Sequence, residues 1–400
     1  MGKLCIIGGG HAAGKLVNNL QKLNYKNDIF VFSEEDSLPY ERPPLSKDFL
    51  FGSKKKDDFL INIDLDKISY FYATKINEID FEKKLIFDSN NATYSYDKLV
   101  FANGSKPKKI SNLDIYGVHY LRSIKDSIKI REDLEKSKNI VLLGGGFISL
   151  EISSSIKQKY PNKKISIIDT SKKILFRNSN DDLREIIIKY QKQHHVNFYL
   201  DTGLRDIEKN VNGYIETIIL NNDEKILCDL LVVGIGVTPN TEILKGSRLY
   251  FENGIKVNEY CETDIKDVYA IGDIAFAKNM FLDKHIREES WNNAEKQSLI
   301  LAQNLTGTKI AFNEIPWFWT DQFKQNFQIL GDINDYDSKI FRNYLENKKT
   351  ILYFKKNKIV GALSENNGRD ISIIRKMIKK NVEIDLEKIQ NIDIDLKNLL

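Results

Sequence analysis

Residues 3–23, KLCIIGGGHAAGKLVNNLQKL, decide the fold that this chain is expected to adopt. The stretch reads as a short buried strand, a glycine turn and an amphipathic helix. Gly8 permits the tight turn, and Gly10 lets the backbone approach a pyrophosphate, whose charge the free N–H groups of the helix receive. Ala13 stands where a third glycine is usual, and one methyl group is tolerated there. The stretch therefore predicts a dinucleotide cradle.

The strand that follows, residues 27–35, supports this interpretation. It ends in Glu34 and Glu35, at about the interval expected for a carboxylate that binds a ribose hydroxyl. A single glycine motif of this kind is weak evidence, because a glycine-rich turn between a strand and a helix gives the same pattern.

A second copy of the pattern begins 136 residues later, in NIVLLGGGFISLEISSSIKQK at residues 139–159. Gly144 and Gly146 fill the two glycine positions, and Ser149 replaces the third. Two copies, each with a strand, a helix, a second strand and a terminal acid, are difficult to produce by chance. The sequence therefore predicts two dinucleotide sites.

Asp169 ends the second strand of the second copy and bears on the choice of cofactor. A carboxylate at this place accepts the 2′-hydroxyl of NAD and repels the 2′-phosphate of NADP. Lys172 and Lys173 follow closely and partly offset the repulsion. NADH is favoured, and how strictly the protein selects NADH over NADPH stays open.

Length and charge fit an ordinary globular protein of two or three domains, since 400 residues exceed the usual size of one core. The net charge of +4 is too small to indicate nucleic acid by itself. Cys5, Cys228 and Cys261 are scattered without metal-ligand spacing, so no metal site is expected. The chain shows no run of about 18 apolar residues and begins directly with a strand. A cytoplasmic protein without membrane contact is expected.

Further stretches carry a family resemblance: LPYERPPLSK at 38–47, REESWNNAEKQ at 287–297 and PWFWTDQF at 316–323. The strands at 229–240 and 267–275 run into glycine, as in flavoproteins with two dinucleotides. With these motifs the chain resembles the FAD-dependent NADH:ferredoxin reductases of ring-hydroxylating dioxygenase and cytochrome P450 systems. Apoptosis-inducing-factor flavoproteins are relatives of that family.

The resemblance implies an α/β fold: two Rossmann-like dinucleotide-binding domains, as in glutathione reductase, plus a small C-terminal α+β domain. Residues 1–117 and 243–318 would form the FAD domain and residues 118–242 the NAD domain. Residues 319–400 would cover the flavin. In this last part, TILYFKKNKIVGAL predicts two strands joined by a polar turn, and GRDISIIRKMIKK predicts a helix capped by Asp370.

Matching motifs imply site residues for FAD and NAD. The implied FAD contacts are Gly8, Gly10, Ala13, Glu34, Glu35, Arg42, Lys47, Ile76, Arg122, Asp273, Ser290, Trp291 and Trp319. The implied NADH contacts are Gly146, Phe147, Ile148, Glu151, Asp169, Gly236 and Glu289. Two residues depart from the usual pattern: Asn103 follows Ala102 where the family has threonine, and Asp169 replaces the commoner glutamate.

The proline-rich stretch 38–47 is expected to hold the flavin. Pro43 and Pro44 fix φ and stiffen the segment. By resemblance, Arg42 approaches the FAD phosphates, while Lys47 lies at the flavin N5 edge and pairs with Glu151. This ion pair is the expected catalytic element, which positions the nicotinamide and stabilises charge.

Simpler interpretations stand beside these. Lys47 in isolation reads as a solvated lysine, Trp319 as core, and Glu151 as half of a surface ion pair. His11 more simply packs or caps than takes part in chemistry. The run 54–56, three lysines, reads as a solvated loop, although it also suits steering of an acidic ferredoxin.

The absence of a cysteine near residues 37–47, and of a cysteine pair after the first cradle, argues against thiol chemistry at the flavin. The expected function is therefore an oxidoreductase that takes hydride from NADH and passes single electrons to a [2Fe–2S] ferredoxin, or to rubredoxin. The alternative is an NADH-sensing flavoprotein like apoptosis-inducing factor. The oligomeric state is left open.

Overall fold

The computed structural model describes residues 2–111, 113–176 and 179–400. The described chain divides into two compact units. The first unit contains residues 1–43, 55–106 and 237–314, and the second contains residues 44–54, 107–236 and 315–400. The predicted boundaries at 117, 242 and 318 stay predictions.

The first unit is built on a parallel sheet in the order β19-β7-β1-β2-β3. Its strands are β1 (Lys3–Ile7), β2 (Asp28–Phe32), β3 (Ser69–Phe71), β7 (Lys98–Phe101) and β19 (Val268–Ala270). Strands β1 and β7 are almost fully buried apolar runs, as expected where helices or further strands cover both faces of a parallel sheet.

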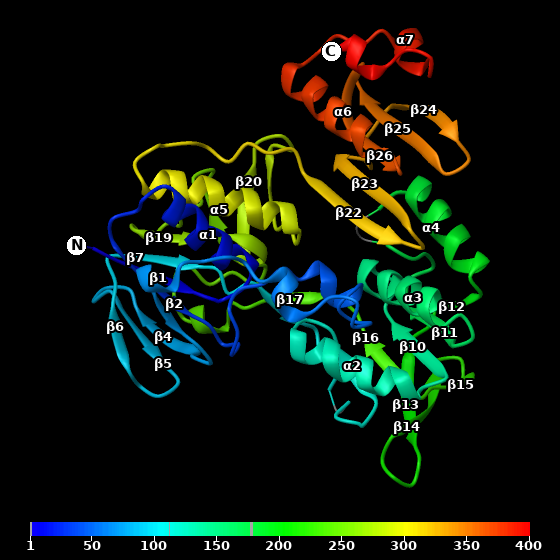
Figure 1. Cartoon of the computed structure of the whole chain (residues 1–400), viewed down its shortest axis with the longest axis horizontal. Coiled ribbons are helices and arrows are strands. Elements are labelled where there is room, and N and C mark those ends of the chain that lie inside the picture. The colour runs from blue at the N-terminus through cyan, green and yellow to red at the C-terminus, as the bar shows by residue number, and fades with distance from the viewer. Residues whose placement is uncertain (1, 112, 177–178) are drawn as a thin grey trace. The chain divides into compact units, whose positions relative to one another are not determined.

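Helices α1 (His11–Lys22) and α5 (Trp291–Leu305) pack against each other beside this sheet (Figure 1). Buried Leu16, Val17 and Leu20 of α1 share a core cluster with Leu301 and Ala302 of α5. A burial of this kind stabilises by about 1.5–3 kcal/mol for each large aliphatic side chain. This shared core fixes the position of the glycine turn that precedes α1.

Two smaller sheets complete the first unit. One is antiparallel, in the order β4-β5-β6, with β4 (Ile76–Asp80), β5 (Leu85–Asp88) and β6 (Thr93–Ser95). The other has the order β18-β20-β21, with β18 (Ile255–Val257), β20 (Ala275–Asn279) and β21 (Lys284–Ile286). Short strands β8 (Ser105–Pro107) and β17 (Val237–Pro239) lie at the points where the chain passes from one unit to the other.

The second unit contains another parallel sheet, in the order β12-β11-β10-β16-β9. Its strands are β9 (Val118–Tyr120), β10 (Asn139–Leu143), β11 (Lys164–Asp169), β12 (Val196–Leu200) and β16 (Leu230–Val233). Helices α2 (Ile124–Lys136), α3 (Phe147–Lys159) and α4 (Asp181–Gln193) accompany it, with the antiparallel strands β13 (Leu204–Lys209), β14 (Ile215–Leu220) and β15 (Lys225–Leu227). This is the second strand–turn–helix copy that the sequence predicts.

The C-terminal part of the second unit is an antiparallel sheet in the order β22-β23-β26-β25-β24. Its strands are β22 (Trp317–Gln322), β23 (Gln325–Gly331), β24 (Ser338–Leu345), β25 (Lys348–Lys355) and β26 (Lys358–Glu365), followed by α6 (Gly368–Lys380) and α7 (Leu386–Gln390). One buried cluster joins Phe327, Ile351 and Leu363 of this sheet to Leu150 and Ile187 of α3 and α4. Strand β22 itself packs against α3.

The predicted C-terminal hairpin is confirmed, since β25 and β26 pair antiparallel around a turn at Lys356 and Asn357, both with positive φ. The predicted cap is wrong. Helix α6 begins at Gly368, and Asp370 lies in its first turn. The Asp370 carboxylate accepts hydrogen bonds from the hydroxyls of Tyr344 and Thr350 instead. An aspartate in the first turn of a helix interacts favourably with the helix dipole even when it does not cap the helix. The sequence pattern alone therefore does not distinguish a capping aspartate from one inside the first turn.

Candidate functional site

The first glycine turn has the shape of a phosphate cradle. Gly8 has φ +115°, and a Cβ there would lie 2.4 Å from the Ala102 carbonyl oxygen, so only glycine fits. Gly10 is the N-cap of α1, provides no side-chain cap, and faces only the Arg42 guanidinium, 3.4 Å from its ideal Cβ. The first turn of α1 contains no acidic residue. The backbone N–H groups at this helix start therefore suit an anion.

Arg42 places a positive charge at this cradle. Its Nη2 lies 2.8 Å from Glu35 Oε1, and its Nη1 donates to the Tyr40 hydroxyl at 3.1 Å. Burial lowers the pKa of Arg42, but Tyr40, Glu35 and Asp273 raise it by more, so the guanidinium stays charged. The Glu35 carboxylate, predicted to bind ribose, is held by Arg42 and Tyr40 in this structure.

Asp273 is brought to the same cradle by topology. It follows Gly272, where a Cβ would lie 2.9 Å from the Cβ of Ala12 in the first turn of α1. Its Oδ2 accepts a hydrogen bond from Ser105 Oγ at 2.8 Å. Beside the turn, buried Asn103 Oδ1 has no hydrogen-bond partner among the described residues. An unpaired buried acceptor next to an open cradle fits a missing polar ligand.

The other residues predicted in the first unit differ in how they are placed. Ser290 is the N-cap of α5, accepting from Asn293 N at 3.1 Å, and Trp291 lies 5.4 Å from the His11 ring. Ile76 is buried in a core cluster, and Ala13 lies on the buried face of α1. Glu34 is exposed and lies 3.6 Å from Lys75 Nζ, whereas Glu289 pairs with Arg287 at 2.5 Å.

His11 belongs to a polar cluster with Glu41 and Glu295, whose ligand-type atoms lie within 4.8 Å of one another. The ammonium of Lys15 lies 2.7 Å from Glu295 Oε1 and 3.7 Å from Glu41 Oε1. Lys15 therefore supplies the positive charge that these carboxylates need. His11 Nε2 also lies 3.1 Å from Glu295 Oε1, and the His11 ring lies against Trp291.

In the second unit, the other glycine turn repeats the cradle. Gly144 has φ +104°, and a Cβ there would lie 2.4 Å from the Gly234 carbonyl oxygen. Gly146 is the N-cap of α3, has no side-chain cap, and has nothing closer than that same oxygen at 4.0 Å from its ideal Cβ. Gly236, with φ +102°, has open space above it. This turn also leaves room for a close backbone approach.

Some of the residues predicted around the second turn form contacts with other parts of the protein. Asp169 Oδ2 accepts from Gly145 N at 2.6 Å, and Oδ1 accepts from Ser171 N at 2.7 Å, so the carboxylate braces the turn. Phe147 packs on Phe318 with ring centroids 4.6 Å apart, while Ile148 is exposed. Arg122 lies before α2, where its N–H donates to Asp126.

Lys47 and Glu151, the predicted catalytic pair, lie together in the second unit, with Lys47 Nζ 3.3 Å from Glu151 Oε1. Glu151 is 5% exposed, and its two oxygens accept from Ser46 Oγ and Thr320 Oγ1, each at 2.8 Å. The ring centroid of Trp319 lies 5.9 Å from Lys47 Nζ. The Lys47–Glu151 contact that the family resemblance implies is therefore present in this structure.

Sequence reasoning missed the network that holds this pair. Thr320 Oγ1 also accepts from Gln322 Nε2 at 3.3 Å, Gln322 Oε1 accepts from Gln191 Nε2 at 2.9 Å, and Gln191 Oε1 accepts from Ser153 Oγ at 2.9 Å. All four side chains are at most 1% exposed. Buried polar side chains in a connected network fix one another's positions. Threonine and glutamine at alternate positions of an aromatic strand were the available signal.

Opposing effects act on Lys47. Burial lowers the pKa of its ammonium, but Glu151 and Asp321 raise it by more, so the net direction is upward. Lys47 is therefore a charged donor at neutral pH, with Asp321 as a carboxylate partner that the sequence did not predict.

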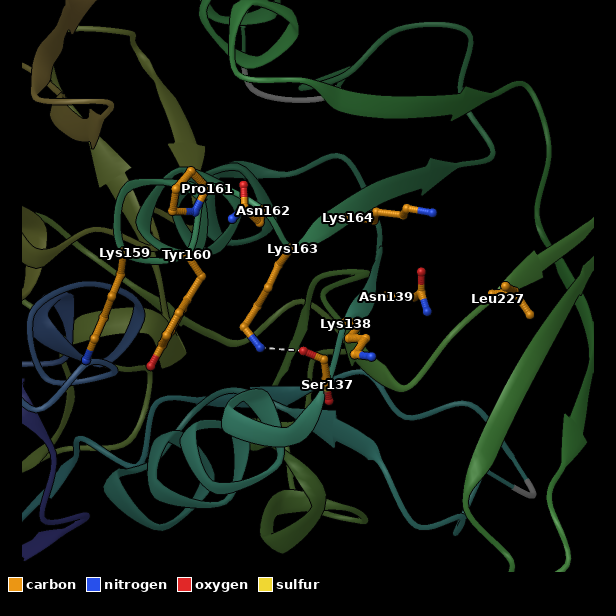
Figure 2. Close-up of a pocket in the computed structure, with 10 residues that line it drawn as sticks. All are labelled: Ser137, Lys138, Asn139, Lys159, Tyr160, Pro161, Asn162, Lys163, Lys164 and Leu227. Atoms are coloured by element: carbon orange, nitrogen blue, oxygen red, sulfur yellow. Dashed lines mark hydrogen bonds between the residues drawn. The ribbon is translucent and has the colours of Figure 1, made fainter.

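A second feature, a lysine-rich pocket at the amino ends of β10 and β11, is not the candidate site (Figure 2). Figure 2 shows Lys159 extending downward at the left of the view and Lys164 extending to the right. Lys159 Nζ donates to the Phe51 carbonyl at 2.8 Å, and Lys163 Nζ donates to the carbonyls of Leu134 and Ser137. These lysines hold backbone carbonyls, including those at the end of α2, rather than converging on a ligand.

The cysteines have no redox arrangement. Cys5, Cys228 and Cys261 are all buried and free. Burial raises the pKa of each thiol to about 12, which disfavours the reactive thiolate. Among the described residues, moreover, no helix is long and apolar enough to cross a membrane.

The parallel sheets and the two glycine turns define the class, an oxidoreductase with two dinucleotide-binding folds. The chain belongs to the pyridine nucleotide-disulphide oxidoreductase family, whose model matches residues 2–298. A reductase C-terminal domain model matches residues 317–400. The family binds FAD and NAD(H), and the open glycine cradles, the Arg42 charge and the unpaired Asn103 oxygen fit such groups.

Three similar proteins carry reductase names. The anthranilate 1,2-dioxygenase system ferredoxin–NAD(+) reductase component of Burkholderia cepacia is 30% identical over 99% of this chain and 98% of its own length. The rubredoxin–NAD(+) reductase of Pseudomonas putida is 32% identical over 84% of this chain and 88% of its own. The crystal structure of the ferredoxin reductase for the CYP199A2 system from Rhodopseudomonas palustris has a TM-score of 0.94 and 25% identity, covering 100% of this chain and 99% of that one.

Proposed function

We propose that this chain is an NADH-dependent reductase that passes electrons one at a time to a [2Fe–2S] ferredoxin or to rubredoxin. The observation that carries the proposal is the pairing of Lys47 with the buried Glu151 beside an open nucleotide cradle. Glu151 lies in the second turn of α3, and Gly146 of the cradle is the N-cap of the same helix. Similarity to a ferredoxin reductase component over 99% of this chain, and to a rubredoxin reductase over 84% of it, supports the proposal.

In the first unit, the proposed FAD-binding groups are the Gly8–Gly10 turn, the N–H groups at the start of α1, and Arg42. The turn gives the backbone access, the helix start receives phosphate charge, and the guanidinium neutralises it. Asp273 is the proposed acceptor for sugar-alcohol hydroxyls. The predicted flavin contacts Lys47, Arg122 and Trp319 belong to the second unit and stay predictions.

In the second unit, the proposed NADH-binding groups are Gly146, the start of α3 and Asp169. When bound, NADH supplies a hydride and FAD converts that two-electron input into single electrons. The protein's own part is electrostatic and positional. Lys47 presents a charged ammonium, and Glu151 is held in one orientation by Ser46 and Thr320, so the pair needs no reorganisation during the reaction.

The absent thiol relay supports the choice of acceptor. Because Cys5, Cys228 and Cys261 are buried and unpaired, the described chain offers no cysteine pair to take electrons. An external one-electron carrier is then the proposed acceptor, and a ferredoxin and a rubredoxin are both compatible with the site.

The test is anaerobic stopped-flow with FAD-loaded protein. NADH is mixed first, and a panel of [2Fe–2S] ferredoxins and rubredoxin is mixed second. Rapid bleaching of flavin absorbance and rapid reoxidation by a carrier are expected. Glu151→Gln should slow bleaching by at least tenfold, because Lys47 loses its buried anionic partner. Glu185→Gln, which alters an exposed glutamate of α4, is the matched control and should leave the rate unchanged.

Two outcomes would overturn the proposal. Wild-type protein whose flavin is not bleached by NADH is not an NADH-dependent reductase. Flavin that bleaches and then persists in its reduced form with every carrier points to an NADH-sensing role instead, for which an NADH-dependent shift on a sizing column is the confirming measurement.

A further inference from the structure

Lys47 has a second carboxylate partner, at closer range than the predicted one. Its Nζ donates to Asp321 Oδ2 at 3.0 Å, compared with 3.3 Å to Glu151 Oε1. Asp321 comes from β22, and 274 positions separate it from Lys47 in the sequence. The ammonium therefore lies between two carboxylates that reach it from different elements.

The two carboxylates have different surroundings. Glu151 is buried, and both of its oxygens are hydrogen-bonded to hydroxyl groups. The Asp321 side chain is 44% exposed, and its other oxygen, Oδ1, accepts from Asn326 Nδ2 at 2.7 Å. Asn326 is the residue that faces Asp321 in the β22–β23 pairing. Asp321 is thus fixed by its own sheet rather than by the pair.

The side chains of strand β22 alternate between two roles because the strand is pleated. Successive side chains point to opposite faces of a strand. Thr320 and Gln322 are buried and continue the network that ends on Glu151. Trp319 and Asp321 alternate with them, and both lie near the Lys47 ammonium. One strand therefore supports both members of the pair.

We propose that Asp321 is a positioning residue that holds the Lys47 ammonium in the orientation used for NADH oxidation. A lysine has a flexible four-carbon stem and three rotatable donors, so one carboxylate does not fix its direction. A second carboxylate at 3.0 Å, itself anchored by Asn326, removes that freedom. This inference rests on the proposed function, because it explains how Lys47 is oriented for the proposed oxidation of NADH.

The first measurement needs no turnover. Acetylation of Lys47 in FAD-loaded protein without NADH is followed by mass spectrometry across pH 7–11. Asp321→Asn keeps the shape of the side chain and removes its charge. We expect Lys47 to react about three- to tenfold faster at pH 8 in this variant, because the loss of an anionic hydrogen-bond acceptor favours the free amine. Asp335→Asn, which breaks the pair with Lys355, is the matched control and should leave Lys47 reactivity unchanged.

The second measurement is the NADH half-reaction. Asp321→Asn should lower the limiting bleaching rate about three- to tenfold, with the NADH concentration at half-saturation unchanged within twofold. Asp321→Glu, which keeps the charge, should recover part of the rate. Thermal unfolding of each variant identifies any general loss of folding.

The outcomes separate the two claims. If wild-type flavin is not bleached by NADH, the proposed function fails and the inference fails with it. If wild-type protein is bleached but Asp321→Asn matches it in both measurements, only the inference is overturned. A slower bleaching rate with unchanged Lys47 reactivity also overturns it, because Asp321 would then act on something other than Lys47.

Discussion

Replacing Thr320 with valine would test the network that holds Glu151. The Thr320 side chain is fully buried, donates to Glu151 Oε1 at 2.8 Å and accepts from Gln322 Nε2 at 3.3 Å. Valine has nearly the same volume, so the change removes the two hydrogen bonds with little cavity. A hydrogen bond to a charged group contributes about 1.5–3 kcal/mol. The weaker, longer bond to Gln322 adds about 0.5 kcal/mol, which gives an expected loss of about 2–3.5 kcal/mol.

The assay is urea unfolding of FAD-loaded protein followed by tryptophan fluorescence. Two of the three tryptophans, Trp317 and Trp319, lie on the same strand as Thr320, so the signal reports on this region. Thr93→Val, on the exposed side of β6, is the control and should change stability by less than about 0.5 kcal/mol. A Thr320→Val protein within about 0.5 kcal/mol of wild type would refute the claim that this hydroxyl is an energetically important partner of Glu151.

Three further predictions follow from the described geometry. Gly8→Ala should fail to fold or to retain FAD, because the new Cβ would lie 2.4 Å from the Ala102 carbonyl oxygen. Gly10→Ala should fold and lose only FAD affinity. Flavin content and thermal unfolding distinguish the two variants. Because the pKa of Lys47 is raised in the folded protein, its ion pairs stabilise the fold fully at pH values below the unfolded pKa of 10.5. That contribution is lost as the pH rises from 10.5 through the higher pKa of the folded state. The stability gap between wild type and Lys47→Met, measured by urea unfolding, should therefore be constant from pH 7 to about pH 10 and shrink at higher pH. Iodoacetamide at pH 8 should leave the buried thiols of the native protein unmodified, as mass spectrometry would show, and rapid labelling would contradict their burial and raised pKa values of about 12.

The sequence predicted the parts of the fold that local rules determine. Both glycine turns follow a buried strand and begin a helix, because Gly8 and Gly144 need positive φ and close backbone approach. The C-terminal hairpin was predictable from its polar turn for a similar reason. The helix start at Gly368 was not, since Asp370 satisfies the same pattern from inside the first turn.

The support for the candidate site was less predictable. The Lys47–Glu151 contact came from a family resemblance, and no local pattern joins residues 104 positions apart. Asp321, Thr320 and Gln322 reach the pair only because β22 packs against α3. Pairings set by tertiary packing of this kind leave at most an alternation of polar and aromatic residues in the sequence.

The segment of residues 44–54 has a consequence for how the protein behaves as two units. The chain enters the second unit at Pro44 and returns to the first at Lys55. The segment is fastened by Lys159 Nζ to the Phe51 carbonyl and by Arg131 Nη1 to the Phe49 carbonyl, besides the Lys47 and Ser46 contacts to Glu151. Arg42 and Lys47, only five positions apart, therefore belong to different units. The Lys47–Glu151 pair is assembled wholly from residues of the second unit, so its geometry is set by contacts within that unit.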